Sequence, residues 1–410
     1  MRPSLLRRRP YSGFYGATAV IYAAAAMFRI ELVWILLQAT RSAVGVTLGL
    51  VAMELPLLVV GLLGPERLGQ GHRRIAVLPL YMGVAMLLAA LGLPLTTAAV
   101  PILLALALLQ GWWDGLLIPL LQSRLMNYPD DAPRTHRSAG FEVASRVGNI
   151  AGPVLAGVLL ADPGRTVALA AAGVLMAAAA GLLANNPLVK APATSTAGES
   201  SSPLTDLAGS IAAVRARPWL SLALGVRGVS NFLWPAFTIG IPLLVLSPWH
   251  GGAAGYGVLR ALWGLSTVGA TLLLTTPAIL ARLKSAYFVS WAVSGLGFLL
   301  LGVSPDYAWA VGATLVGGMG SPLVHVALDS EIGEHIPPAQ QGHVFALQRL
   351  VMSALILIGL LVLGPLVSAL GAARVLLGAG LVMLAAAAGG LAWHQRSRAP
   401  RAPTDAAGAA

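Results

Sequence analysis

Long, uninterrupted apolar runs constrain this chain more than any other feature of its sequence. Each run is close to the roughly 20 apolar residues with which a helix crosses the hydrocarbon layer of a bilayer. Only helices and closed barrels satisfy their backbone hydrogen bonds in lipid, and these runs are continuous rather than alternating, so they predict helices. The twelve segments cover approximately residues 14–39, 43–64, 75–95, 97–124, 140–160, 165–186, 218–246, 254–277, 285–304, 307–330, 344–368 and 372–393.

The composition excludes a soluble globular domain. Of the 410 residues, 57% are hydrophobic and 10% are charged, whereas soluble domains have about 45–50% and about 25%. We therefore predict an all-α integral membrane protein with 12 transmembrane helices. Without cysteine, the chain has no disulfides or thiolate metal sites. We expect no catalytic residues, no metal and no cofactor.

The basic residues predict how the chain crosses the membrane. The net charge of +11 would indicate a nucleic-acid partner in a soluble protein. In a membrane protein, positive charge gathers on cytoplasmic loops, so no nucleic-acid partner is expected. If the N-terminus is cytoplasmic, 20 of the 26 Lys and Arg residues fall on the inner side, three on the outer side and three within helices. Both termini are then cytoplasmic, and the number of spans is even.

A polar stretch near the middle divides the chain into two similar halves. Gly152-Pro153 in the fifth segment has a counterpart about 210 residues later in Gly364-Pro365 of the eleventh. A parallel repeat of this kind is typical of transporters. Residues 204–214 in the central stretch form a short amphipathic pattern that predicts a helix on the membrane surface. The predicted parts are a tail at 1–13, a six-helix bundle at 14–186, a cytoplasmic linker at 187–217, a second bundle at 218–393 and a tail at 394–410.

With this order of parts the chain resembles the major facilitator superfamily over essentially its whole length. The stretch GNIAGPVLAG resembles the glycine- and proline-rich signature of helix 5 in the antiporter branches, and its key residues are Gly148, Gly152, Pro153 and Gly157. The stretch GHVFA at 342–346 is similar to a pattern of macrolide and siderophore exporters. The resemblance implies two six-helix bundles that rock around a central cavity.

The most specific motif of that superfamily, in the loop between helices 2 and 3, departs from its usual form here. The sequence has GLLGPERLGQGHRR at 61–74, and neither alignment places both the leading glycine and the acidic residue correctly. The charge relay of the family is therefore in question, and the basic cluster has two interpretations, a gating role or an ordinary cytoplasmic loop. The residues concerned are Gly61, Glu66, Arg67, Arg73 and Arg74.

Ionisable residues inside spans are costly and are candidates for function. Arg29 and Glu31 are two residues apart, about 200° around a helix, so they do not share a face. Glu31 forms a polar and aromatic stripe with Trp34 and Gln38 that is typical of a cavity lining. Arg29 lies at the same depth as Glu54 of the second segment, and we predict an intramembrane ion pair between them. The alternative is a pair between Arg29 and Glu31.

A second set of candidates comes from the fourth and seventh segments. Asp114 and Arg227 have matching depths in opposite halves, which predicts a gate, a substrate and proton site, or a static ion pair. Arg260 lies near the outer end of the eighth segment and is expected to reach the membrane surface. Glu31 and Asp114 are the predicted proton-coupling carboxylates. The predicted cavity residues are Trp34, Gln38, Trp112, Trp113, Arg227, Asn231 and Trp234.

These observations and the resemblance predict a secondary active transporter rather than an enzyme. The expected activity is proton-coupled export of amphiphilic small molecules such as drugs, natural products or siderophores. The expected partners are the small-molecule substrate, protons and the lipid bilayer of a bacterial plasma membrane, and a monomer is expected. Uptake of a metabolite and lipid flipping remain alternatives on the same fold. A membrane enzyme is disfavoured because the acidic pair Asp130-Asp131 lies in a basic loop.

Overall fold

A computed structural model describes residues 9–63, 72–92, 97–126, 128, 134–162, 164–190, 203–274 and 276–398. All regular elements among these residues are helices. The N-terminal half contains α1 (Arg9–Thr40), α2 (Ala43–Leu63), α4 (His72–Gly92), η1 (Thr97–Ala99), α5 (Val100–Met126), α6 (Arg134–Ala161), α7 (Arg165–Ala184) and α8 (Pro187–Lys190). The C-terminal half contains α9 (Pro203–Arg215), α10 (Pro218–Leu246), α11 (Gly252–Leu274), α12 (Pro277–Leu280), α13 (Leu283–Gly302), α14 (Tyr307–Met319), α15 (Pro322–His335), α16 (Pro338–Leu370) and α17 (Ala372–Arg398).

Every predicted apolar segment contains helix, and one is divided. The segment at 307–330 splits into α14 and α15 between Met319 and Pro322, because proline lacks the N–H that would continue the helix and favours its first turn. Among the described residues, ten helical stretches have the length and hydropathy to cross a bilayer, and the apolar part of α4, Val77–Gly92, is shorter. The protein is therefore a multi-pass membrane protein, whereas twelve crossings and cytoplasmic termini stay predictions.

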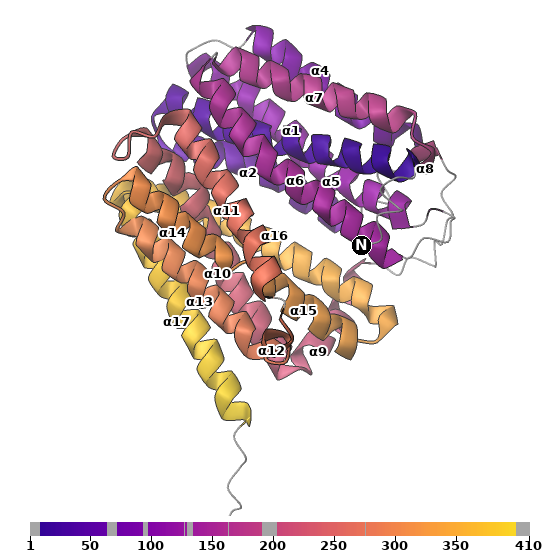
Figure 1. Cartoon of the computed structure of the whole chain (residues 1–410), viewed down its shortest axis with the longest axis vertical. Helices are drawn as coiled ribbons and strands as arrows, with labels where there is room; N and C mark the ends of the chain where they lie inside the picture. Colours follow the sequence, from indigo (N-terminus) through magenta and orange to yellow (C-terminus); the bar gives the residue numbers. More distant parts are fainter. Residues whose placement is uncertain are drawn as a thin grey trace, which may run out of the picture.

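The helices pack as two groups that follow each other along the chain (Figure 1). In the first group, α1 lies against α6 and α7, and α4 lies against α7. In the second, α13 lies against α14 and α17, and α10 lies against α16 and α17. Helix α9 forms where the amphipathic pattern predicted one, and it packs on α16 and α10.

The two groups meet through α6 with α11 and through α2 with α16. A Cβ added at Gly257 would overlap the Pro153 carbonyl and lie 2.9 Å from Gly157 Cα. Helices α6 and α11 can therefore approach this closely because Gly157 and Gly257 have no side chains. Near the same end, the rings of Trp34 and Tyr256 stack with centroids 6.2 Å apart. These contacts lie toward the end of α1 and the start of α11, the side predicted to face outward.

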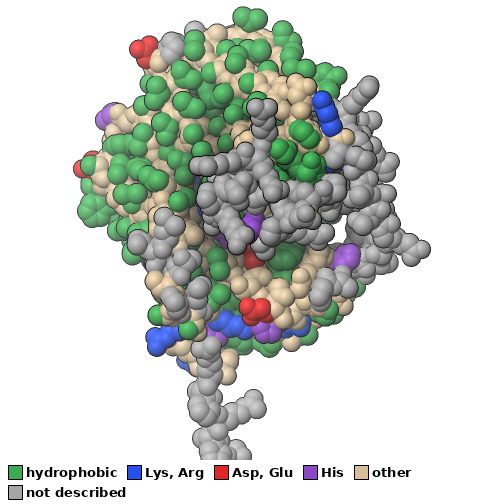
Figure 2. Space-filling model, turned by 45° about the vertical axis from the view of Figure 1, so that its right-hand side comes forward, with side chains coloured by type: hydrophobic (Ala, Val, Ile, Leu, Met, Phe, Trp, Pro, Cys, Tyr) green, Lys and Arg blue, Asp and Glu red, His purple; other side chains and the backbone are tan. Residues whose placement is uncertain are grey.

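The outer surface is apolar, as a lipid-facing surface requires. Large hydrophobic side chains such as Leu88, Leu91 and Val158 are more than half exposed. Figure 2 shows hydrophobic side chains over much of the visible face, with charged side chains near its lower end and a few at its upper margin. In water such a surface would be unstable, whereas lipid solvates it.

Candidate functional site

A cavity of about 320 Å³ lies between the two helix groups. Helices α1, α5 and α6 form one side of it, and α10 and α11 form the other. It combines charged, aromatic and small residues, which is the composition of a small-molecule site. Its lining consists of Ile21, Tyr22, Ala25, Ala26, Arg29, Ile30, Trp113, Asp114, Ile118, Asn149, Pro153, Trp234, Arg260, Trp263 and Gly264.

Two of the charged residues in the wall have partners within the N-terminal group. Arg29 Nη1 lies 3.6 Å from Glu54 Oε1, so the structure brings together the two residues that their depth in the membrane had paired. Asp114 Oδ1 accepts a 2.8 Å hydrogen bond from Gln110 Nε2 one turn earlier in α5. Arg29 also acts electrostatically on Asp114. Arg29 is therefore paired with Glu54 and lies in the same cavity wall as Asp114.

The third charged residue of the wall, Arg260, was expected to reach the membrane surface, and this prediction is wrong. Its guanidinium lines the cavity, with Cζ 5.4 Å from the centroid of the Phe237 ring. Arg260, Trp263 and Gly264 follow i, i+3, i+4 spacing, so one face of α11 presents all three to the cavity. This spacing is visible in the sequence and is the pattern that could have predicted Arg260 as a cavity residue.

Aromatic rings of α10, α11 and α13 pack behind and beside Arg260. The centroids of Trp234 and Trp263 are 5.2 Å apart in an edge-to-face arrangement, and Phe237 lies 4.8 Å from Trp263. Phe298 lies 5.9 Å from Trp263 and completes the cluster. Trp234 was a predicted cavity residue, and its side chain lines the cavity here. Across from it, Trp113 of α5 also lines the wall as predicted.

Five other predicted cavity residues do not line the cavity: Trp112, Gln38, Trp34, Asn231 and Arg227. Trp112 is 38% exposed on the outer surface of α5. Its neighbour Trp113 lines the cavity, and adjacent helical residues differ by about 100° in direction, so Trp112 points away from it. Gln38 is exposed near the end of α1, and Trp34 is buried in its contact with Tyr256. Asn231 donates from Nδ2 to the carbonyl of Arg227 in its own helix, at 2.8 Å.

Arg227 does not form a pair with Asp114 in this structure. Its Nη2 lies 3.2 Å from His325 Nδ1 of α15, within the C-terminal group. Asp329, one turn after His325, acts electrostatically on Arg227. Matching depth had selected Arg227, but depth does not fix the direction in which a helical residue points.

Glu31 has a setting unlike that of Asp114. Its side chain is fully buried in α1, and neither carboxyl oxygen has a hydrogen-bond partner among the described residues. It does not line the cavity, and it does not pair with Arg29. It lies one helical turn before Trp34, whose ring contacts the other helix group.

The glycine-rich stretch of α6 lies at two helix contacts. Side chains at Gly148 and Gly152 would overlap the α1 carbonyls of Ala19 and Ala23, so both glycines allow α6 to lie close to α1. Gly157 makes the contact with α11, and Pro153 lines the cavity between them. The stretch therefore connects the cavity wall to the contact between the two helix groups.

The loop motif between the second and third predicted helices is largely outside the described residues. Gly61 lies in the last turn of α2 and Arg73 and Arg74 lie in the first turn of α4. Glu66 and Arg67 lie outside the described residues, as do the side-chain positions of Arg73 and Arg74.

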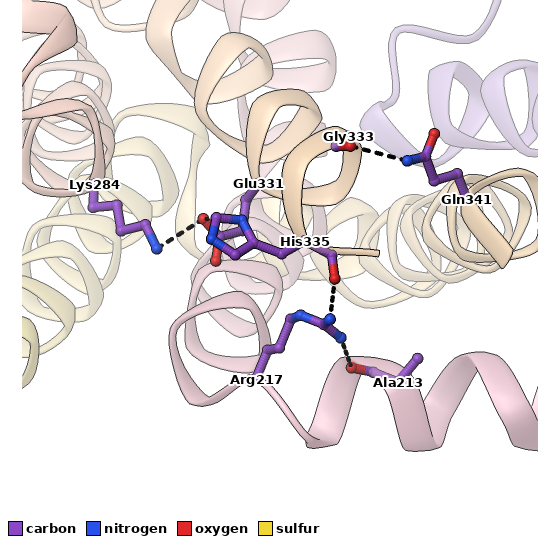
Figure 3. Close-up of polar contacts among 7 residues, drawn as sticks. All are labelled: Ala213, Arg217, Lys284, Glu331, Gly333, His335 and Gln341. Atoms are coloured by element: carbon purple, nitrogen blue, oxygen red, sulfur yellow. Dashed lines mark hydrogen bonds and ion pairs between the residues drawn. The ribbon is translucent and has the colours of Figure 1, made fainter. Parts of the chain in front are cut away.

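A second polar cluster lies at one end of the C-terminal group (Figure 3). Lys284 Nζ at the start of α13 is 2.8 Å from Glu331 Oε2 of α15, and His335 Nδ1 is 3.5 Å from the same oxygen. Arg217, just before α10, donates to the carbonyl of His335. These contacts fasten α10, α13 and α15 to one another, and we assign the cluster a structural role.

Comparison with known proteins identifies the fold and the family. The family model described as Major Facilitator Superfamily matches residues 14–360. No curated protein matches the sequence. A solved POT family transporter in complex with a thioalcohol conjugated peptide superposes with a TM-score of 0.74 at 11% identity, covering 96% of this chain and 98% of that one.

Two further solved structures share the fold. The nucleoside transporter NupG has a TM-score of 0.71 at 14% identity, with 93% of this chain and 99% of that chain covered. A bacterial homologue of the human lysosomal transporter Spinster, in an inward-facing and unoccupied conformation, has a TM-score of 0.68 at 14% identity, with 95% and 98% covered. These neighbours show the fold that the chain shares with them.

Proposed function

Because the chain belongs to the Major Facilitator Superfamily, we propose that it is a proton-coupled secondary transporter that exports amphiphilic small molecules by alternating access. The two moving bodies are the helices of residues 14–186 and those of 218–393, joined by the linker at 187–217. Twelve spans then leave both termini in the cytoplasm. The observation that carries the proposal is the cavity between the two helix groups, with Asp114 in its wall.

The lining supports an amphiphilic substrate. Trp113, Trp234 and Trp263 offer apolar rings, and Asp114, Arg29 and Arg260 offer charge within the same 320 Å³. Such a site holds a molecule by apolar contact and fixes its orientation by a few polar groups.

Asp114 is the proposed proton-coupling group of the cavity. Arg29 lies in the same cavity wall and is already paired with Glu54 at 3.6 Å. When Asp114 binds a proton, Arg29 is left with Glu54 alone, and when Asp114 is ionised, Arg29 is attracted to both carboxylates. A substrate group that donates a hydrogen bond to Asp114 competes with the proton for this carboxylate. This competition couples the movement of substrate to the movement of protons.

Glu31 is the second proposed proton-coupling group. A buried carboxyl group without a partner is costly when ionised, so we infer that Glu31 holds a proton while the wall around it stays closed. The contacts of Trp34 with Tyr256 and of Gly157 with Gly257 close the side predicted to face outward. Separation of the two bundles at this end would bring water toward Glu31 and release the proton.

Export is supported by the glycine- and proline-rich stretch of α6, which resembles that of antiporters and lies where α6 meets α1 and α11. The GHVFA stretch at 342–346 favours the macrolide and siderophore exporter branch, and the compact, arginine-rich chain fits a bacterial plasma membrane.

The test is the accumulation of fluorescent amphiphiles in a drug-hypersensitive bacterial host. Fluorescein, Nile red and rhodamine 123 supply an anion, a neutral molecule and a cation. We expect wild type to lower the accumulation of at least one of them, and we expect Asp114→Asn or a protonophore to abolish this effect. Trp112→Phe, on the outer surface of the same helix, is the matched control. Unchanged accumulation despite confirmed membrane expression would refute export, and raised accumulation would indicate uptake.

A further inference from the structure

We propose that Arg260 binds an anionic group of the substrate, so that this transporter takes amphiphiles bearing a carboxylate or sulfonate. The inference rests on the proposed function, because it assumes that the cavity is the transport site. Beyond the proposed function, it specifies the charge of the substrate and names Arg260 as the residue that recognises this charge.

The first argument is the distribution of partners among the cavity charges. Arg29 has Glu54, and Asp114 has Gln110 and lies within electrostatic reach of Arg29. Arg260 takes part in no ion pair among the described residues, and its contact is with the face of Phe237. Charged residues within membrane spans are rarely left without an oppositely charged partner. Arg260 is therefore the cation of this wall that has no anion of its own.

The second argument is the charge of the cavity as a whole. Arg29 and Arg260 come from opposite helix groups and line the same cavity, so their like charges repel each other. Their repulsion is relieved when an anion lies between them, since a bidentate guanidinium–carboxylate contact adds directed hydrogen bonds to the Coulomb attraction. Glu54 offsets the charge of Arg29, so the remaining positive charge of the wall is that of Arg260, which Asp114 offsets only when it is ionised.

The third argument is the surroundings of Arg260. Trp263 lies one turn after it on the same face of α11, with Trp234 5.2 Å away from Trp263 between centroids. A molecule that places its anionic group on Arg260 thus has aromatic rings beside its apolar part. Gly264, at i+4, lies close to α6, because an added Cβ would be 3.1 Å from Ile150 Cγ1.

The geometry also gives anion binding a role in the transport cycle. An anion held by Arg260 of α11 while its body packs on Trp113 of α5 contacts both helix groups at once. Only contacts that differ between the two states of a transporter can shift their populations. A ligand that bridges the two groups meets this requirement.

The experiment measures binding of two probes with one shape and different charge, 2-naphthylacetate and 2-naphthylacetamide, to the purified full-length chain in nanodiscs, with empty nanodiscs subtracted. We expect the acetate to bind about tenfold more tightly, equivalent to about 1.4 kcal/mol. Arg260→Gln should remove the difference between the probes, and Arg260→Lys should restore part of it. Arg374→Gln, at an exposed position near the start of α17, is the control. The melting temperature of each variant shows whether it is folded.

The outcomes separate this inference from the proposed function. Equal affinity of wild type for the two probes would overturn the anionic substrate and leave an amphiphile site in place. If a folded Arg260→Gln variant lost the same affinity for both probes, the inference would also be overturned. Arg260 would then contribute to the shape of the cavity and would not distinguish the charge of the ligand. If folded wild type bound neither probe, the proposed function of the cavity and the inference would both fail.

Discussion

At the scale of single residues, the ion pair between Arg29 and Glu54 has the most direct consequence for stability. Its two side chains are 38% and 13% exposed, so Glu54 lies mostly out of water. Replacing Glu54 by Gln leaves Arg29 without its carboxylate. We expect the free energy of unfolding to fall by about 1–3 kcal/mol, less than for a fully buried pair because Arg29 is partly exposed. Thermal unfolding in detergent measures this loss.

The control for this pair is a double-mutant cycle. Arg29→Gln together with Glu54→Gln removes both charges, so the double variant should lose less stability than the sum of the two single losses. An unchanged melting temperature in Glu54→Gln, or strictly additive losses, would show that the two side chains do not stabilise each other.

At the scale of helices, the contact between α6 and α11 depends on Gly257. A side chain there would overlap the Pro153 carbonyl, so Gly257→Val must push the two helices apart. We expect the loss of this packing to destabilise the present conformation by about 1–3 kcal/mol and to reduce transport. Gly269→Val is the matched control, because on the same helix an added Cβ at Gly269 meets nothing within 4 Å. Similar effects of the two substitutions would mean that helix propensity, not the contact, is responsible.

At the scale of the whole molecule, the two helix groups should move as bodies. The chain contains no cysteine, so spin labels can be attached at introduced cysteines without removing native ones. One pair, at Asp162 and Asp306, reports on the side that is in contact here, and a second, at Lys190 and Arg282, reports on the opposite side. We expect substrate, or a rise in pH that ionises Glu31, to lengthen the first distance and shorten the second. Changes of the same sign, or none, would contradict alternating access.

The sequence predicted the helices better than it predicted the site, and the reason is physical. Apolar length and charge asymmetry specify where a helix lies along the chain and how deep each residue is. Depth alone therefore paired Arg29 with Glu54 correctly. It also paired Asp114 with Arg227, a pair that is not formed in this structure, where Arg227 lies against His325 within its own group.

The face that a helix turns toward the cavity is set by packing between elements, which a single sequence records weakly. Trp112 and Trp113 are neighbours in sequence, yet only Trp113 lines the cavity. The position of Arg260 was predicted wrongly for the same reason. The prediction used its distance from the outer end of the helix and not the i, i+3, i+4 face that it shares with Trp263 and Gly264. The break between α14 and α15 was readable from Pro322, but continuous hydropathy concealed it.

Proton movement in proteoliposomes tests the central claim most directly. Purified wild type and Asp114→Asn would be reconstituted with a pH-sensitive dye inside, and an amphiphile that the cellular assay identifies would be added outside. The account predicts that substrate entry through wild type drives protons out of the vesicles, whereas Asp114→Asn exchanges substrate across the membrane without moving protons. Equal proton movement in the two proteins, or substrate transport by wild type without any proton movement, would contradict it.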